Sequence, residues 1–216
     1  MLKSRIEDIR ANTKNMDRAQ KREYIMAYYW HYMLAAVMLA ALAAVTVYHF
    51  TWGIRKPLFS LAIINQGTDY ERDEKIQQGF SKAYGIKSRD VSVSSDYLLS
   101  YGDIHPANAN ESMFERFFLG WNSGALDAVI MPESFLKYCI GKGGEFMEIT
   151  DKWHSGADMD KCLYKQGNAG TGIYIDSTSL AGDFKSSSKD PLLLVFMKNS
   201  SHIAECMDFV EFIIKR

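Results

Sequence analysis

Polar residues that could contact a ligand follow three short apolar runs, at the points where predicted strands end. They are Asn65 and Gln66, then Ser95, Asp96 and Tyr97, then Glu133 and Ser134. In an open parallel α/β sheet, ligands bind beyond the carboxyl ends of the strands, where helix N-termini offer N–H groups to an anion. These seven residues are therefore the candidate ligand-binding residues, with Tyr97 available to stack on the ligand. The alternative is that they are turn and cap residues without a ligand.

Metal and catalytic chemistry have little support in the sequence. His154, Asp158, Asp160 and Cys162 form the one metal-like cluster, and their spacing matches no standard zinc pattern. The glycine-rich stretches 141–144 and 167–172 match neither a P-loop nor a dinucleotide-binding fingerprint. The sequence also contains no Gly-x-Ser-x-Gly nucleophile elbow. We therefore predict a non-catalytic protein without a metal site or cofactor.

The three cysteines, Cys139, Cys162 and Cys206, allow at most one internal disulfide. Cys139 and Cys206 fall on the apolar faces of predicted helices, where a buried free thiol is the ordinary outcome.

Apolar runs and helical periodicity alternate along residues 55–216. Strands are predicted at 58–65, 91–94, 126–131 and 192–197, with weaker ones at 145–150 and 172–176. Helices are predicted at 73–84, 110–121, 132–140 and from Ser200 or Ser201 to about 214. The helix at 110–121 buries Met113, Phe114, Phe117 and Phe118 as one stripe. This alternation predicts a layered α/β domain with a largely parallel sheet.

The first 54 residues predict a membrane anchor. No charged residue lies between Glu23 and Arg55, and aromatic residues gather at both ends of this apolar stretch. All glycines and prolines lie at Gly53 or later, so nothing before that position must break a helix. The predicted organisation is a basic tail at 1–23, a transmembrane helix at 24–54 and an α/β domain at 55–216.

Basic residues set the predicted orientation. Four of them, Lys14, Arg18, Lys21 and Arg22, flank the start of the apolar stretch, and two, Arg55 and Lys56, flank its end. Over longer segments, residues 1–23 carry a net charge of +3 and residues 55–216 a net charge of −4. The positive-inside bias places the N-terminus in the cytoplasm and the C-terminal domain outside the cell membrane. The competing interpretation is a signal peptide cleaved near Ala41-Leu42-Ala43. The long charged region before the apolar run and the length of that run favour an uncleaved signal anchor.

The whole-chain totals hide this division. A net charge of −1 over 216 residues and a mean hydropathy of −0.19 exclude a disordered chain and a strongly basic nucleic-acid binder. The predicted partners are the lipid bilayer, a membrane protein packed on the transmembrane helix, or a small solute, and no nucleic acid.

The segment from Trp121 to Glu133, WNSGALDAVIMPE, resembles a unit of extracellular solute-binding proteins of the periplasmic-binding-protein type. In that unit a helix and a small-residue turn lead into a Leu-Asp-apolar strand. Leu192–Ile214 is similar to the returning strand and last helix of such proteins. Lys21–Ile25 and Tyr28–Trp30 look like the juxtamembrane start of single-pass proteins of Gram-positive bacteria. The resemblance covers about 100 residues and implies a lobe reduced in length, whose second lobe could only lie between about residues 150 and 190.

Two functions follow as expectations. The first is a single-pass membrane-anchored extracytoplasmic domain that binds a small solute or a partner membrane protein. The second is an assembly or scaffold subunit of a membrane complex that has no ligand of its own.

Overall fold

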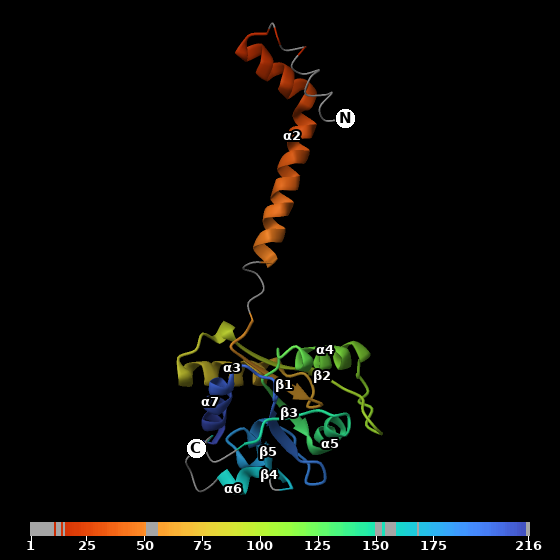
Figure 1. The fold of residues 1–216 in the computed structure, drawn as a ribbon, viewed down its shortest axis with the longest axis vertical. Coiled ribbons are helices and arrows are strands. Elements are labelled where there is room, and N and C mark those ends of the chain that lie inside the picture. The colour runs from red at the N-terminus through yellow and green to blue at the C-terminus, as the bar shows by residue number, and fades with distance from the viewer. Residues whose placement is uncertain are drawn as a thin grey trace. The chain divides into compact units, whose positions relative to one another are not determined.

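The computed structural model describes residues 11, 14, 16–50, 56–149, 153, 159–167 and 169–214, without the side chains of Ile25, Met159 and Asp160. The chain divides into two compact units, Met1–Arg55 and Lys56–Arg216. The first contains the apolar helix and the second contains the α/β domain (Figure 1).

Helix α2 spans Arg18–Tyr48 and begins at a capping box. The Asp17 carboxylate accepts a hydrogen bond from a backbone N–H of the first turn, and the Gln20 side chain accepts one from the Asp17 N–H at 3.1 Å. Within α2, Met26–Tyr48 has a mean hydropathy of 1.8 and is long and apolar enough to cross a membrane. A signal sequence has the same properties, so the choice between anchor and signal peptide, and the orientation, stay predictions.

The second unit is built on a sheet that has six strands within the described residues (Figure 1). They are β1 (Phe59–Ile64), β2 (Val91–Tyr97), β3 (Ala128–Pro132), β4 (Leu163–Gln166), β5 (Ala169–Tyr174) and β6 (Leu192–Phe196), in the spatial order β2-β1-β3-β6-β5-β4. β1 pairs in parallel with β2 and β3, whereas the pairs β3–β6, β6–β5 and β5–β4 are antiparallel.

The prediction of a largely parallel sheet is therefore wrong, although the mixed α/β class is confirmed. Parallel neighbours need a long crossover, usually a helix. Helices α3 (Tyr70–Tyr84) and α4 (Glu111–Asn122) supply it between β1 and β2 and between β2 and β3. Beyond β4 the connections hold only the short 3₁₀ turns Ile175–Ser177 and Ala181–Asp183, so the strands reverse direction.

Helices cover both faces of the sheet. α3 and α7 (Ile203–Ile214) pack on the face that carries Phe59, Leu61 and Ile63 of β1. α4 and α5 (Glu133–Gly141) pack on the other face, which carries Ala62 and Ile64 (Figure 1). This alternation is the period-two pleat of a strand buried on both sides.

The remaining differences from the sequence prediction lie between residues 145 and 176. The predicted strand at 145–150 makes only an isolated bridge between Phe146 and Met197, and Thr150 lies outside the described residues. β5 begins three residues before the predicted 172, and β4, which follows the short helix α6 (Met159–Cys162), was not predicted. The described part of 150–190 joins the same sheet through β4 and β5 instead of forming a second lobe.

Candidate functional site

The seven predicted ligand-binding residues lie at the carboxyl edge, the edge of the sheet where β1, β2 and β3 end. The Asn65 side chain makes two hydrogen bonds with the backbone of Leu99, donating to its carbonyl at 3.0 Å and accepting from its N–H at 2.7 Å. Asn65 has a φ of 55°, which Asn tolerates better than most residues. It thus fastens the loop after β1 to the loop after β2.

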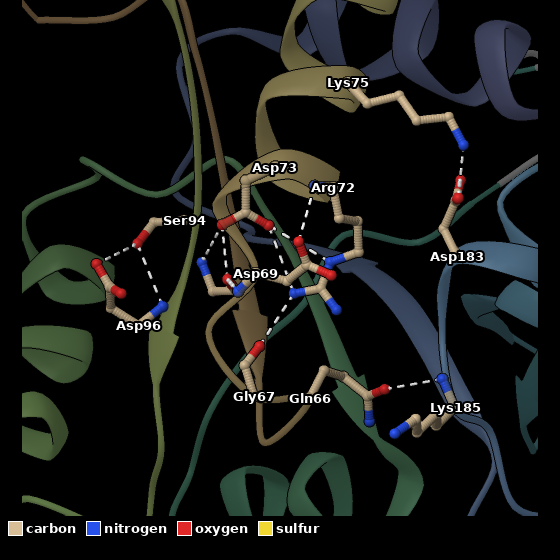
Figure 2. Close-up of polar contacts among 11 residues, drawn as sticks. Gln66, Gly67, Asp69, Arg72, Asp73, Lys75, Ser94, Asp96, Asp183 and Lys185 are labelled. Carbon is tan, nitrogen blue, oxygen red and sulfur yellow. Dashed lines mark hydrogen bonds and ion pairs between the residues drawn. The ribbon is translucent and has the colours of Figure 1, made fainter.

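Ser95 belongs to a buried polar cluster that the sequence did not reveal. Its other members, Asp69, Arg72 and Asp73, are labelled in Figure 2. The Ser95 N–H and hydroxyl both donate to the Asp73 carboxylate, at 2.8 and 2.6 Å, and its hydroxyl accepts from the Asp69 N–H at 3.0 Å. Asp69 in turn caps α3 by accepting from the Arg72 N–H. Arg72, also buried, donates to Asp73 at 3.4 Å and to the Gly67 carbonyl at 3.1 Å. The cluster locks the start of α3 onto β2.

Gln66, Asp96 and Tyr97 lie around this cluster. The Gln66 side chain accepts from the Lys185 N–H at 3.1 Å (Figure 2). Asp96 accepts from the Ser94 and Tyr70 hydroxyls, both at 3.4 Å. Tyr97 is buried and its ring packs edge-on against Phe117, so it is not exposed for stacking on a ligand. Burial raises the pKa of the Tyr97 phenol and keeps it neutral.

Glu133 and Ser134 start α5. The Ser134 N–H and hydroxyl donate to the Asp190 carboxylate at 2.9 and 2.6 Å, so the N-terminus of α5 is already capped by an acid of the same chain. The Tyr101 hydroxyl lies 2.8 Å from the Ser134 hydroxyl, and burial raises the Tyr101 pKa. Glu133 accepts from the Tyr164 hydroxyl and pairs with Lys137.

One segment, residues 175–190, connects these groups; we call it the strap. Asp183 pairs with Lys75 at 2.6 Å, the Phe184 ring covers the Arg72 guanidinium at 4.9 Å, and Asp190 reaches Ser134. The structure thus brings all seven predicted residues to one edge and gives each of them partners within the chain. Whether any of them binds a ligand stays a prediction.

A concave surface lies elsewhere, at the C-terminal ends of α4 and α5. A hollow of about 440 Å³ has four aromatic residues in its wall: Phe114, Phe118, Trp121 and Tyr138. A second hollow of about 350 Å³ shares Trp121, Asn122 and the Gly143-Gly144 turn with the first. We call the two together the aromatic groove. Because α4 and α5 both run away from the carboxyl edge, their last residues place the groove near the amino edge, where β1, β2 and β3 begin.

The rings of the aromatic groove hold one another in place. Phe118 stacks on Trp121, with ring centroids 5.8 Å apart and planes at 17°, and Phe114 lies 4.7 Å from Phe118. Gly144 permits this packing, since a Cβ there would overlap the Trp121 ring and lie 2.8 Å from the Cys139 carbonyl oxygen. Of the predicted buried stripe only Phe117 is fully buried, whereas Met113, Phe114 and Phe118 are half-buried and pack against the core.

Charge at the groove is limited. The Lys142 ammonium lies 5.7 Å from the centre of the Tyr138 ring. At the second hollow Lys198 pairs with Glu145 at 2.8 Å. Burial raises the pKa of the Cys139 thiol to about 12, so this lining residue is uncharged.

A buried carboxylate at the amino edge has the residue types of a hydrolase triad without its geometry. Asp127 accepts from the Ser60 N–H at 2.8 Å and the Ser200 hydroxyl at 2.5 Å, and its Oδ1 lies 3.0 Å from Nδ1 of His202. Both the hydroxyl and the imidazole contact the acid, whereas in a triad the imidazole lies between them. The arrangement is a clamp that joins β1, β3 and the start of α7.

The metal-like cluster of the sequence lies between residues 154 and 162. His154 and Asp158 lie outside the described residues, as does the Asp160 side chain. In the part of the chain that the structure does describe, no group of three or more His, Cys, Asp or Glu side chains could hold a metal ion. Cys139, Cys162 and Cys206 are buried thiols, and none of them forms a disulfide.

The sequence indicated the carboxyl edge but missed Arg72, Asp73, the strap and the aromatic groove. A signal for the groove was present in the aromatic residues at 114, 118 and 121 and in the glycine-rich stretch 141–144. Comparison with known proteins finds no protein-family model that matches the chain and no curated protein that is significantly similar to it.

Proposed function

We propose that the protein is a single-pass membrane-anchored binding domain without catalytic activity, and that it binds its ligand in the aromatic groove. The domain would lie outside the cell membrane with the N-terminus in the cytoplasm. The observation that carries the proposal is the groove itself, a solvent-open hollow with four aromatic residues in its wall.

Its size and composition are those of a small-molecule site. Pockets for such ligands are usually about 300–1,000 Å³, mainly apolar, with a few polar groups that fix orientation. The aromatic groove has a volume of about 440 Å³ in its first hollow, with Lys142 and Asn122 as its polar side chains. Half-buried Phe114 and Phe118 leave ring surface for a ligand to cover, which is where burial of apolar area gives affinity.

The anchor is supported by α2. This predominantly apolar helical segment of 23 residues rises about 35 Å, which is enough for the hydrocarbon core of a bilayer. The larger number of basic residues before the apolar stretch than directly after it agrees with the proposed orientation.

The carboxyl edge supports solute binding less well. Asn65, Ser95 and Ser134 each make short hydrogen bonds with their neighbours, and a solute there would have to replace those bonds. We assign these residues to holding the loops and the strap in place.

The alternative is an assembly or scaffold subunit that contacts a partner membrane protein through α2. Alanines recur at 36, 40 and 44, on one side of the helix, and such small residues allow close helix packing. In this case the groove would have no ligand.

Two variants on α4 test the proposal. The full chain in detergent is heated with and without amino acids, peptides, sugars and aromatic acids, and the melting temperature is recorded. We expect at least one solute to raise it, since a ligand that binds only the folded state stabilises that state. Phe114→Gln should abolish the shift, whereas Leu119→Gln, which changes the neighbouring turn but not the groove lining, should retain it.

Two outcomes would contradict the proposal. A shift that survives Phe114→Gln would place the ligand elsewhere, and a complete lack of shifts would favour the scaffold.

Topology is tested separately by protease treatment of intact cells. Digestion of the N-terminal tail with the α/β domain protected would reverse the proposed orientation.

A further inference from the structure

We infer that the ligand of the aromatic groove is a small monoanion with an aromatic or bulky apolar body, and that Lys142 binds its negative charge. The inference rests on the proposed function, because it concerns the same groove, and adds the chemical class of the ligand.

The apolar body is indicated by the arrangement of the rings. Phe114, Phe118 and Trp121 follow one another along α4, and Tyr138 of α5 contributes the fourth aromatic residue of the wall. The ring surface open to a guest is that of the half-buried Phe114 and Phe118, because Trp121 is buried beneath Phe118. Aromatic guests gain offset-stacked and edge-to-face contacts there in addition to burial of apolar area.

The negative charge is indicated by Lys142. Its ammonium contacts the Tyr138 ring and, among the residues that the structure describes, no carboxylate. No acidic residue lines the first hollow, and Cys139 is a neutral thiol because burial raises its pKa to about 12. The first hollow therefore has a formal charge of +1, which one negative charge on the ligand would balance.

Other donors near this position are occupied. The N–H groups of Lys142, Gly143 and Gly144 donate to carbonyl oxygens at the end of α5, between 2.9 and 3.2 Å. Lys198, which lines the second hollow, is paired with Glu145. Recognition of the charge therefore depends on Lys142, with the Asn122 amide as a neutral hydrogen-bonding group beside it.

A matched pair of probes tests the inference. 1-Naphthaleneacetate and 1-naphthaleneacetamide have the same shape and differ in charge. Their dissociation constants are measured by thermophoresis on the full chain held in amphipol at low salt. We expect the anion to bind about two- to fivefold more tightly than the amide, as for a partly exposed ion pair.

Two lysine variants then test whether Lys142 is the residue that binds the negative charge of the ligand. Lys142→Gln should make the two dissociation constants equal, whereas Lys82→Gln, which removes a lysine of α3 on the other face of the sheet, should leave their ratio unchanged. Because Lys142 is exposed, its replacement should not alter the melting temperature of the unliganded protein.

The outcomes separate this inference from the proposed function. Equal binding of both probes, weakened by Phe114→Gln, would overturn the negative charge and leave the groove as the binding site. A preference that survives Lys142→Gln would overturn the role of that residue. Binding of neither probe would overturn the ligand class. Displacement of the anion by phosphatidylglycerol vesicles, but not by phosphatidylcholine vesicles, would assign the groove to a lipid headgroup instead.

Discussion

The Asp127 clamp makes a quantitative prediction about stability. Its carboxylate is 1% exposed and accepts hydrogen bonds from the Ser60 N–H and the Ser200 hydroxyl, and Ser60 and Ser200 are themselves buried. Asp127→Ala removes the acceptor and leaves these two donors without a partner. Each buried unsatisfied group costs about 1–3 kcal/mol, so we expect the free energy of unfolding to fall by about 3–5 kcal/mol. His202 adds little, because its side chain is 29% exposed and water can replace the lost contact.

Asp127→Asn is the matched control. The Asn carbonyl oxygen can still accept from the Ser60 N–H, and its amide can donate to the Ser200 hydroxyl, whose oxygen already accepts one hydrogen bond from the His202 N–H and can accept a second. The variant therefore keeps a hydrogen bond to both groups, while the Ser200 hydroxyl hydrogen loses the carboxylate and is left with the Cys206 sulfur at 4.0 Å as its acceptor. We expect a loss of about 1–2 kcal/mol, clearly smaller than for alanine.

Urea unfolding of the full chain in detergent, followed by near-ultraviolet circular dichroism, measures both losses. This signal reports side-chain packing, so the helical content that α2 keeps in the micelle does not obscure the transition. The slope of the unfolding free energy against urea concentration should be the same in the native protein and both variants, because the surface exposed on unfolding does not change. An alanine variant within about 1 kcal/mol of the native protein, or equal losses for alanine and asparagine, would refute the reasoning.

Three further predictions concern other parts of the domain. Burial and the neighbouring Glu205 and Glu211 raise the pKa of Asp208, so ionisation of this carboxyl lowers the stability of the folded state. Asp208→Asn should therefore raise the melting temperature at pH 7. This gain should disappear as the pH falls below 4, because the aspartate is then protonated in both the folded and the unfolded state. Burial raises the pKa values of Cys139 and Cys206 to about 12. Neither thiol should therefore react with N-ethylmaleimide at pH 7.5 in the native protein, whereas both should react in denaturant. Peptide mass spectrometry measures the modification. Gly144→Ala should displace the Trp121 ring and lower the melting temperature by several degrees; an unchanged melting temperature and unchanged tryptophan emission would contradict the packing inferred for the aromatic groove.

Much of the fold could be predicted because local pattern determines it. The fully buried strands β1, β3 and β6 are continuous apolar runs, and α3 ends at Gly85, whose φ of 67° suits glycine. The direction of β4, β5 and β6 has no such local signal. It depends on whether a helix crosses the sheet between them, and the polar stretch at 175–190 was compatible with several paths.

In the candidate site, too, some features follow from local sequence and others only from the tertiary structure. The chain order of β1, β2 and β3 was enough to bring Asn65, Ser95 and Ser134 to one edge. Their partners are not local: Asp190 lies 56 residues from Ser134, and Asp73 lies 22 residues from Ser95. A polar residue after a strand has the same appearance in a sequence whether it contacts a ligand or a distant carboxylate. Only the tertiary path of the strap distinguishes the two cases.

The aromatic groove follows from the geometry of α4. Phe117 and Trp121 form one row at i, i+4 spacing, and Phe114 and Phe118 form another. Neighbouring residues on a helix are about 100° apart, so the second row turns away from the sheet when the first packs on it. The second row needs cover from another element, and α5 covers it only in part, which leaves Phe114 and Phe118 half-buried. An apolar stripe this wide predicts an additional contact surface beside the core, and in this chain that surface is where we expect the ligand.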